Sequence, residues 1–159
     1  VIYEAALNEY APLGIEAAVT NTATVSGTGI TPVTAAETVN AEAAPNLAIT
    51  KSVSPVPVTE NGTLTYTFRI QNYGSVAATN TTGVVITDTF APVLSNLTAA
   101  LNGTAWTAAT DYTYNEATGT FSSTAGAITV PAATYTQDST TGAWVVTPGE
   151  STLVITGTV

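Results

Sequence analysis

The feature that most constrains this chain is the strict alternation of apolar and polar side chains over residues 62–74, GTLTYTFRIQNYG. Leu64, Tyr66, Phe68 and Ile70 fall on one face of an extended chain, and the polar residues between them fall on the other. A period of two is typical of a strand that buries one face and exposes the other. The pattern predicts a strand here and requires an apolar core against one face of its sheet.

Other segments carry the same signature. Residues 47–53 and 84–90 alternate next to prolines, and residues 151–159 read as an extended strand. YTYNEATGTF (112–121) and YTQDSTTGAW (135–144) share an aromatic residue, a turn ending in Thr-Gly and a second aromatic residue, which predicts two hairpins. Because every element is a strand and turn signals recur at short intervals, we predict an all-β fold, an antiparallel β-sandwich.

The N-terminal part of the chain is organised differently. Residues 1–10, 18–27 and 33–42 are three strand-like pieces separated by glycine and proline, and AEAAPN (41–46) marks a boundary. Three strands with so few large side chains would not be stable alone, so we expect them to need a partner sheet.

Composition excludes several classes of function. The net charge is −9, with Lys51 and Arg69 as the two basic residues, so a nucleic acid would be repelled. The chain has no cysteine and no histidine, which removes disulfides, thiol nucleophiles and histidine bases, and we expect no cofactor, no metal and no enzyme with turnover. No apolar run is long enough to span a bilayer, so we expect no membrane insertion. Acidity, abundant threonine and scarce lysine favour an extracellular, cell-surface location.

Three strands each place one strongly polar residue on an apolar face. Lys51 shares its face with apolar residues of the strand 47–53, Asp88 lies among apolar residues of 84–90, and Asn21 does so within 18–27. Buried ionic groups are normally paired. Two interpretations follow, and periodicity alone leaves both open.

The first interpretation is an ion pair between Lys51 and Asp88 whose remaining hydrogen bonds are made with Asn21. The second is chemical, since a dry site favours a neutral amine and a protonated acid. The Lys51 amine would then attack the side-chain amide of Asn21 while Asp88 acts as the proton-transferring catalyst and ammonia leaves. The product is a Lys–Asn isopeptide, formed once without turnover.

Several of these stretches together resemble the prokaryotic surface repeat known as the conserved repeat domain, or domain of unknown function eleven. They are PNLAITKSVSP (45–55), residues 62–92 with Asn72-Tyr-Gly74 and the TDT motif around Asp88, and VTNTATVSG (19–27). The resemblance implies an immunoglobulin-like sandwich in long, tandemly repeated extracellular proteins of bacteria and archaea. Similar surface domains carry isopeptides, which assigns Lys51 and Asn21 as the cross-link and Asp88 as its catalyst.

The order of the motifs departs from the family, because Asn21 precedes Lys51 here. The chain therefore reads as an incomplete or permuted sandwich, with residues 45–159 as the main domain. Residues 1–43 could fold back onto it within one chain, but we favour their being strands that close the sandwich of a neighbouring subunit or repeat. An unfilled sandwich accepts an added strand, and head-to-tail donation builds an open fibre. We predict a structural subunit or repeat of an extracellular filament, pilus-like fibre or surface stalk, whose partner is another copy of itself.

The alternative function is an adhesin or carbohydrate-binding module that recognises cell-surface glycans. Trp106, Tyr112, Tyr114 and Trp144 flank the predicted hairpins and would form an aromatic platform for sugars. The competing interpretation is that these rings cap the edge of the core. Exposure of two or more adjacent rings would favour the adhesin.

Overall fold

In the part of the chain that the computed structural model describes, residues 4, 6–12, 14 and 17–159, twelve strands pair into four antiparallel sheets. In chain order they are β1 (Ala18–Gly27), β2 (Ile30–Asn40), β3 (Leu47–Ser54), β4 (Thr63–Asn72), β5 (Thr87–Thr89), β6 (Ser95–Leu101), β7 (Thr104–Ala105), β8 (Tyr112–Asn115), β9 (Thr120–Ser123), β10 (Thr134–Gln137), β11 (Trp144–Thr147) and β12 (Gly149–Thr158). A single 3-10 turn, Asn80–Thr82, is the one helical element among these residues. The all-β prediction is confirmed.

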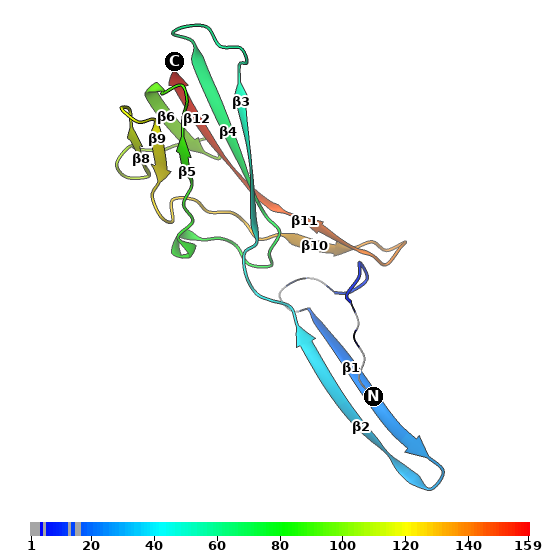
Figure 1. Ribbon diagram of the computed structural model, residues 1–159. Coiled ribbons are helices and arrows are strands. Elements are labelled where there is room, and N and C mark those ends of the chain that lie inside the picture. Colours follow the sequence, from blue (N-terminus) through cyan, green and yellow to red (C-terminus); the bar gives the residue numbers. More distant parts are fainter. Residues whose placement is uncertain (1–3, 5, 13, 15–16) are drawn as a thin grey trace.

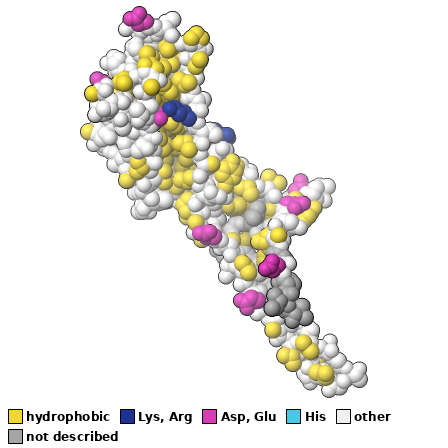
Figure 2. Space-filling view, in the orientation of Figure 1, with side chains coloured by type: hydrophobic (Ala, Val, Ile, Leu, Met, Phe, Trp, Pro, Cys, Tyr) yellow, Lys and Arg dark blue, Asp and Glu magenta, His cyan; other side chains and the backbone are white. Residues whose placement is uncertain are grey.

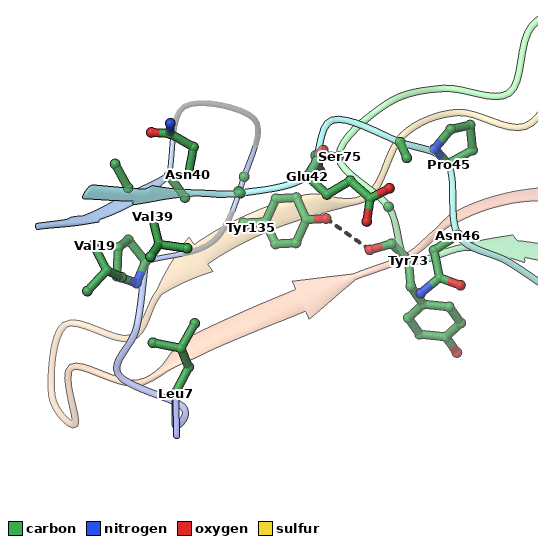
Figure 3. Close-up of a pocket in the computed structure, with 17 residues that line it drawn as sticks. Leu7, Val19, Val39, Asn40, Glu42, Pro45, Asn46, Tyr73, Ser75 and Tyr135 are labelled. Atoms are coloured by element: carbon green, nitrogen blue, oxygen red, sulfur yellow. Dashed lines mark hydrogen bonds between the residues drawn. The ribbon is translucent and has the colours of Figure 1, made fainter. Parts of the chain in front are cut away.

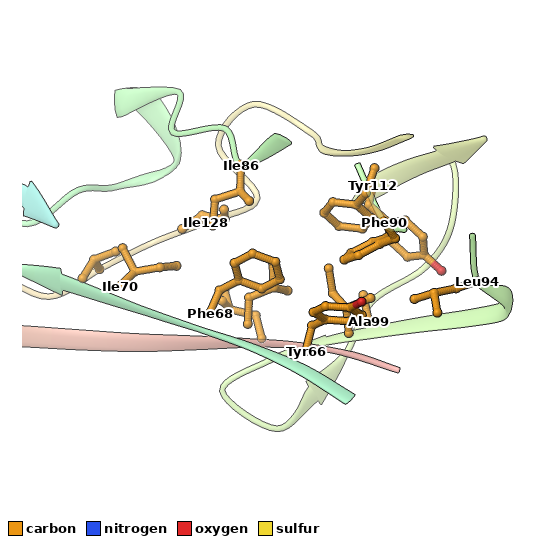
Figure 4. Packing of buried hydrophobic residues seen from close by; sticks show 14 of the residues in the cluster. Tyr66, Phe68, Ile70, Ile86, Phe90, Leu94, Ala99, Tyr112 and Ile128 are labelled. Atoms are coloured by element: carbon orange, nitrogen blue, oxygen red, sulfur yellow. The ribbon is translucent and has the colours of Figure 1, made fainter. Parts of the chain in front are cut away.

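Two of the sheets enclose the core. A five-stranded sheet has the order β3-β4-β12-β6-β7, and a three-stranded sheet with the order β5-β9-β8 covers part of it (Figure 1). Between them pack aromatic and branched aliphatic side chains that are almost completely buried (Figure 4). The largest are Phe90, Phe121, Leu94, Ile128 and Leu153. This is a sandwich-like antiparallel architecture, as the alternating patterns predict.

The strand that alternates most clearly in the sequence is central to this core. Leu64, Tyr66, Phe68 and Ile70 of β4 are all buried, while the residues between them are partly or fully exposed. Both predicted hairpins also form, as β8–β9 and β10–β11. The strand predicted over residues 84–90 is shorter than expected, because only β5 makes ladder hydrogen bonds.

The hairpin of β1 and β2 projects from the sandwich at the end opposite the C terminus (Figure 1). Its two strands pair only with each other, and every residue in them except Val19 is exposed. The remaining strand-like piece, residues 1–10, is predicted to be extended. Of these, residue 4 and residues 6–10 are not strand, and residues 1–3 and 5 lie outside the described residues.

A buried asparagine anchors the end of the linker between the hairpin and the sandwich. The Asn72 side chain is fully buried and makes four hydrogen bonds. Its Oδ1 accepts from the backbone N–H of Asn46 and of Gly74, each at 2.9 Å, and its Nδ2 donates to the carbonyls of Val76 at 2.8 Å and Pro131 at 3.0 Å. Because all four polar contacts are satisfied, this side chain fixes the start of β3 and the turn after β4 together.

Gly74 allows the linker to pass close to this turn. A Cβ added here would lie 2.1 Å from the carbonyl oxygen of Ala44 and 2.5 Å from the backbone nitrogen of Asn46. Both neighbours are backbone atoms of the segment that connects β2 to β3, so neither can move aside as a side chain would. The Asn-x-Gly motif thus has a structural role at the junction.

We expect Asn72→Ala to lower the free energy of unfolding by about 3–5 kcal/mol, because it leaves several buried backbone groups without partners. Gly74→Ala should cost about 1–3 kcal/mol through overpacking. Urea denaturation monitored by tryptophan fluorescence measures both. A cost below 0.5 kcal/mol for Asn72→Ala, on the order of a surface substitution, would contradict this account of the junction.

Candidate functional site

The inward face of β3 is left uncovered. In the register with β4, Ile49 pairs with Ile70, Lys51 with Phe68 and Val53 with Tyr66, so these β3 side chains share the face that carries the core. Yet Ile49 is 52% exposed and Val53 is 40% exposed, whereas their β4 partners are buried.

The uncovered face of β3 borders a gap between the edge strands of the two sheets, which we call the opening. β3 is the outer strand of the five-stranded sheet, and β5 is the outer strand of the three-stranded one. Figure 2 shows apolar side chains gathered in a stripe along this side of the sandwich and in patches over the hairpin. An exposed apolar face beside two free strand edges has the features that added strands pair with in other proteins.

Lys51 and Asp88 meet across this opening. The Nζ atom of Lys51 donates to Oδ2 of Asp88 at 2.5 Å, which joins β3 of one sheet to β5 of the other. Their side chains are 39% and 18% exposed, respectively. The sequence therefore predicted the pair correctly, but the pair is open to water rather than buried, because no strand lies over it.

Aromatic rings surround the ammonium group on the core side. The Nζ atom of Lys51 lies 4.8 Å from the ring centroid of Tyr66, 5.5 Å from that of Phe68 and 5.4 Å from that of Phe90. Such contacts attract a cation to the ring faces. The amine is thus held at the mouth of the core with its remaining side turned to solvent.

The second basic residue takes no part in this site. Arg69 points to the other face of β4, where its guanidinium binds Glu150 of β12, and Gln71 donates to the same carboxylate at 3.0 Å. Lys51 is therefore the one amine beside the uncovered face of β3.

Asn21 is not brought to this pair within the chain. It lies in β1, on the hairpin that extends away from the sandwich. In the β1–β2 register, Val19 pairs with Val39, Asn21 with Glu37 and Val25 with Val33, so these residues share one face.

The opposite face of the hairpin is polar. It carries mainly threonines, and the hydroxyl groups of Thr20 and Thr38 are 2.8 Å apart. The hairpin therefore has one threonine face and one apolar face whose polar members are Asn21 and Glu37.

Glu37 is a site residue that the strand-by-strand reading of the sequence missed. Its position beside Asn21 depends on the register of the hairpin, which the tight turn at residues 28–29 sets. Recognising that turn would have placed the carboxylate next to the amide.

The predicted aromatic platform does not form one exposed surface. Tyr112 is buried, and burial raises the pKa of its phenol. Tyr114 donates its hydroxyl proton to the carbonyl of Leu94 at 2.9 Å and packs on the core, as does Trp106. Trp144 is half-buried in the separate β10–β11 hairpin.

One small hollow of about 220 Å³ lies beside two of these rings. It is lined by Leu97, Ala108, Tyr112, Tyr114 and Glu116. Because Tyr112 is buried and Tyr114 packs on the core, the hollow lacks the two adjacent exposed rings that the carbohydrate hypothesis needs.

Among the described residues, acidic side chains form no group of three that could hold a metal ion. None of the helical structure within that part of the chain has the length and hydrophobicity to cross a bilayer. Comparison with protein-family models, curated proteins and solved structures finds no match to this chain.

The exposure of the ion pair predicts a small contribution to stability. We expect Asp88→Asn to lower the free energy of unfolding of the monomer by less than about 1 kcal/mol. Phe90→Ala, which removes a buried ring beside the same site, should cost about 3–5 kcal/mol. Equal losses in urea denaturation would show that the pair is a stabilising bridge and not an open site.

Proposed function

We propose that this chain is the subunit of an extracellular filament in which the β1–β2 hairpin of one copy completes the immunoglobulin-like sandwich of the next. The observation that carries the proposal is the pair of unsatisfied apolar surfaces. The inward face of β3 is half-exposed, and the apolar face of the hairpin is exposed as well, with Val25 and Val33 at 67% and 66%. A two-stranded hairpin is marginally stable in water, so its apolar face needs a partner.

The two surfaces match in pattern. Along β1 the apolar face carries Val19, Asn21, Ala23 and Val25, and along β3 the inward face carries Leu47, Ile49, Lys51 and Val53. Each has one polar residue among apolar ones. If β1 lies antiparallel over β3 with the Asn21 amide above the Lys51 amine, each of the other three residues on the apolar face of β1 lies over an apolar residue of β3. In the parallel arrangement, Val25 lies beyond the end of β3.

Strand addition would occur at the free edge of β5. A hairpin paired there extends the three-stranded sheet over β3 and places Asn21 on the side of Lys51 and Asp88. Antiparallel addition continues the pairing of the neighbouring ladders, since β5 itself pairs antiparallel with β9. Covering the open face removes apolar surface from water, at about 25 cal/mol per Å².

The donor and acceptor features lie at different places on one chain, so each copy can donate and accept at once. The hairpin is at one end of the molecule and the open sandwich is at the other (Figure 1). Such a heterologous contact does not close on itself and propagates into a fibre.

A covalent bond would lock each joint. Once the hairpin excludes water from the site, the neutral amine of Lys51 attacks Cγ of Asn21, and a new C–N bond forms as the amide C–N bond breaks. Asp88 transfers the proton from the amine to the departing nitrogen, which leaves as ammonia. The bond joins two subunits and its formation uses each site once.

The hairpin provides a matched pair of variants for testing strand donation. Val25→Asp places a charge on the apolar face, and Thr24→Asp places the same charge on the threonine face of the same strand. Both side chains are exposed in the single chain, so we expect neither to change its folding. Val25→Asp should remain monomeric in light scattering and electron microscopy, whereas Thr24→Asp should form fibres. Equal behaviour of the two would contradict donation through this face.

Denaturing gels and intact mass test the covalent step. Fibres should resist boiling in detergent, and each joint should lack the mass of one ammonia molecule. Lys51→Ala and Asn21→Ala should each give chains that run as monomers in the gel. Fibres that dissociate into chains of unmodified mass would exclude the isopeptide and leave strand donation standing.

A further inference from the structure

The molecule has a largely apolar cavity at the base of its hairpin. About 510 Å³ in volume, it lies where the hairpin meets the sandwich and is open to solvent. Its walls include Leu7, Val19, Val39, Pro45 and Tyr135, as Figure 3 shows. Glu42 is the one charged residue among the described residues that line it.

The walls of this cavity are held in place by the junction. The hydroxyl of Tyr135 donates to the carbonyl of Tyr73 at 2.9 Å (Figure 3). Ser75 donates to the carbonyl of Glu42 at 3.1 Å. These bonds tie β10 and the turn after β4 to the linker, so the cavity is a shaped feature between the hairpin and the sandwich.

An apolar loop is exposed at the other end of the molecule. The β3–β4 loop, residues 55–62, begins with Pro-Val-Pro, and Val56 is 76% exposed. Among the large apolar side chains that the structure describes as exposed, this fraction is the highest. The first charged residue of the loop is Glu60, so its leading half is wholly apolar.

The inference rests on the proposed strand donation, because donation determines which surfaces of neighbouring subunits meet. With Asn21 over Lys51 and β1 antiparallel to β3, the base of the hairpin at Ala18 comes to the level of Ser54. Both lie three residues from the site, about 10 Å along a strand. The donor's hairpin base, where the cavity opens, is thereby brought next to the acceptor's β3–β4 loop.

The direction of β5 gives the same placement. Asp88 lies at the level of Lys51. Phe90 contacts Tyr66 with a ring-centroid distance of 4.7 Å, and Tyr66 is at the level of Val53. β5 therefore runs in the same direction as β3. A hairpin strand antiparallel to β5 enters the acceptor from the end that carries the β3–β4 loop.

We propose that residues 55–57 of the acceptor subunit dock into the cavity at the hairpin base of the donor subunit. The occupant is a second copy of this chain, and its apolar residues would meet the apolar walls of the cavity, Val19, Val39 and Tyr135 among them. Val19 and Val39 line the cavity and also lie on the inserted face of the hairpin, so the contact is continuous with the donated strands. Each joint is then held at two places, and the angle between hairpin and sandwich is fixed in the fibre.

Engineered thiols test this contact, because the chain has no cysteine of its own. Val56→Cys chains are mixed with Val39→Cys chains, assembled, treated with a short bismaleimide and mapped by mass spectrometry of the digest. We expect a cross-linked peptide between positions 56 and 39. Val145→Cys, whose thiol is exposed on β11 at the end of the sandwich remote from the β3–β4 loop, should give none with Val39→Cys.

A second thiol pair separates this inference from the proposed function. Ile49→Cys and Ala23→Cys report insertion of the hairpin over β3. Fibres in which positions 49 and 23 are linked but 56 and 39 are not would overturn the loop contact and leave strand donation intact. Absence of both links would overturn both.

Charge at the loop gives an independent measurement. Val56→Asp should raise the protein concentration at which fibres appear by about tenfold, because it brings a carboxylate into an apolar cavity. Val145→Asp, which places the same charge at an exposed position of β11, should leave that concentration unchanged. Equal concentrations for wild type and Val56→Asp would contradict docking of the loop.

Discussion

The structure depends on an apolar core that one chain does not close. β4 and β12 bury their inward faces completely, but the neighbouring edge strand β3 leaves Ile49 and Val53 half in water. The ion pair of Lys51 and Asp88 spans the gap between the two sheets without filling it. Other distinctive features are complementary to this gap, including the apolar face of the hairpin and the free edge of β5.

Most strands of the sandwich could be predicted from the sequence because the patterns that specify them are local. The alternation in β4 and the Thr-Gly turns of the two short hairpins specify strand, face and turn within about ten residues each. The short extent of β5 could not be predicted in this way, since ladder pairing depends on where β9 ends. The turn that follows Asn8 has only a weak local signal, the asparagine itself, because it contains neither glycine nor proline.

The candidate site also has features that the sequence predicts and features that it does not. Phase along each strand correctly places Lys51 and Asp88 on inward faces, and the structure brings them together. The alternation along each strand does not reveal that the pair stays open to water, since this depends on how far the neighbouring strands cover β3. Glu37 was missed because its proximity to Asn21 is a property of hairpin register. The buried Asn72 network likewise joins segments far apart in the chain, which single-strand patterns do not report.

Backbone amide exchange tests the central claim most directly, because it follows the donated and accepting strands in the same experiment. The free edge of β5 and the hairpin strands should exchange rapidly in the monomer and become protected together on assembly. β4 and β12 should be protected in both states and serve as the internal reference. Assembled protein in which β1, β2 and β5 exchange as fast as in the monomer would contradict completion of the sandwich by a neighbouring hairpin.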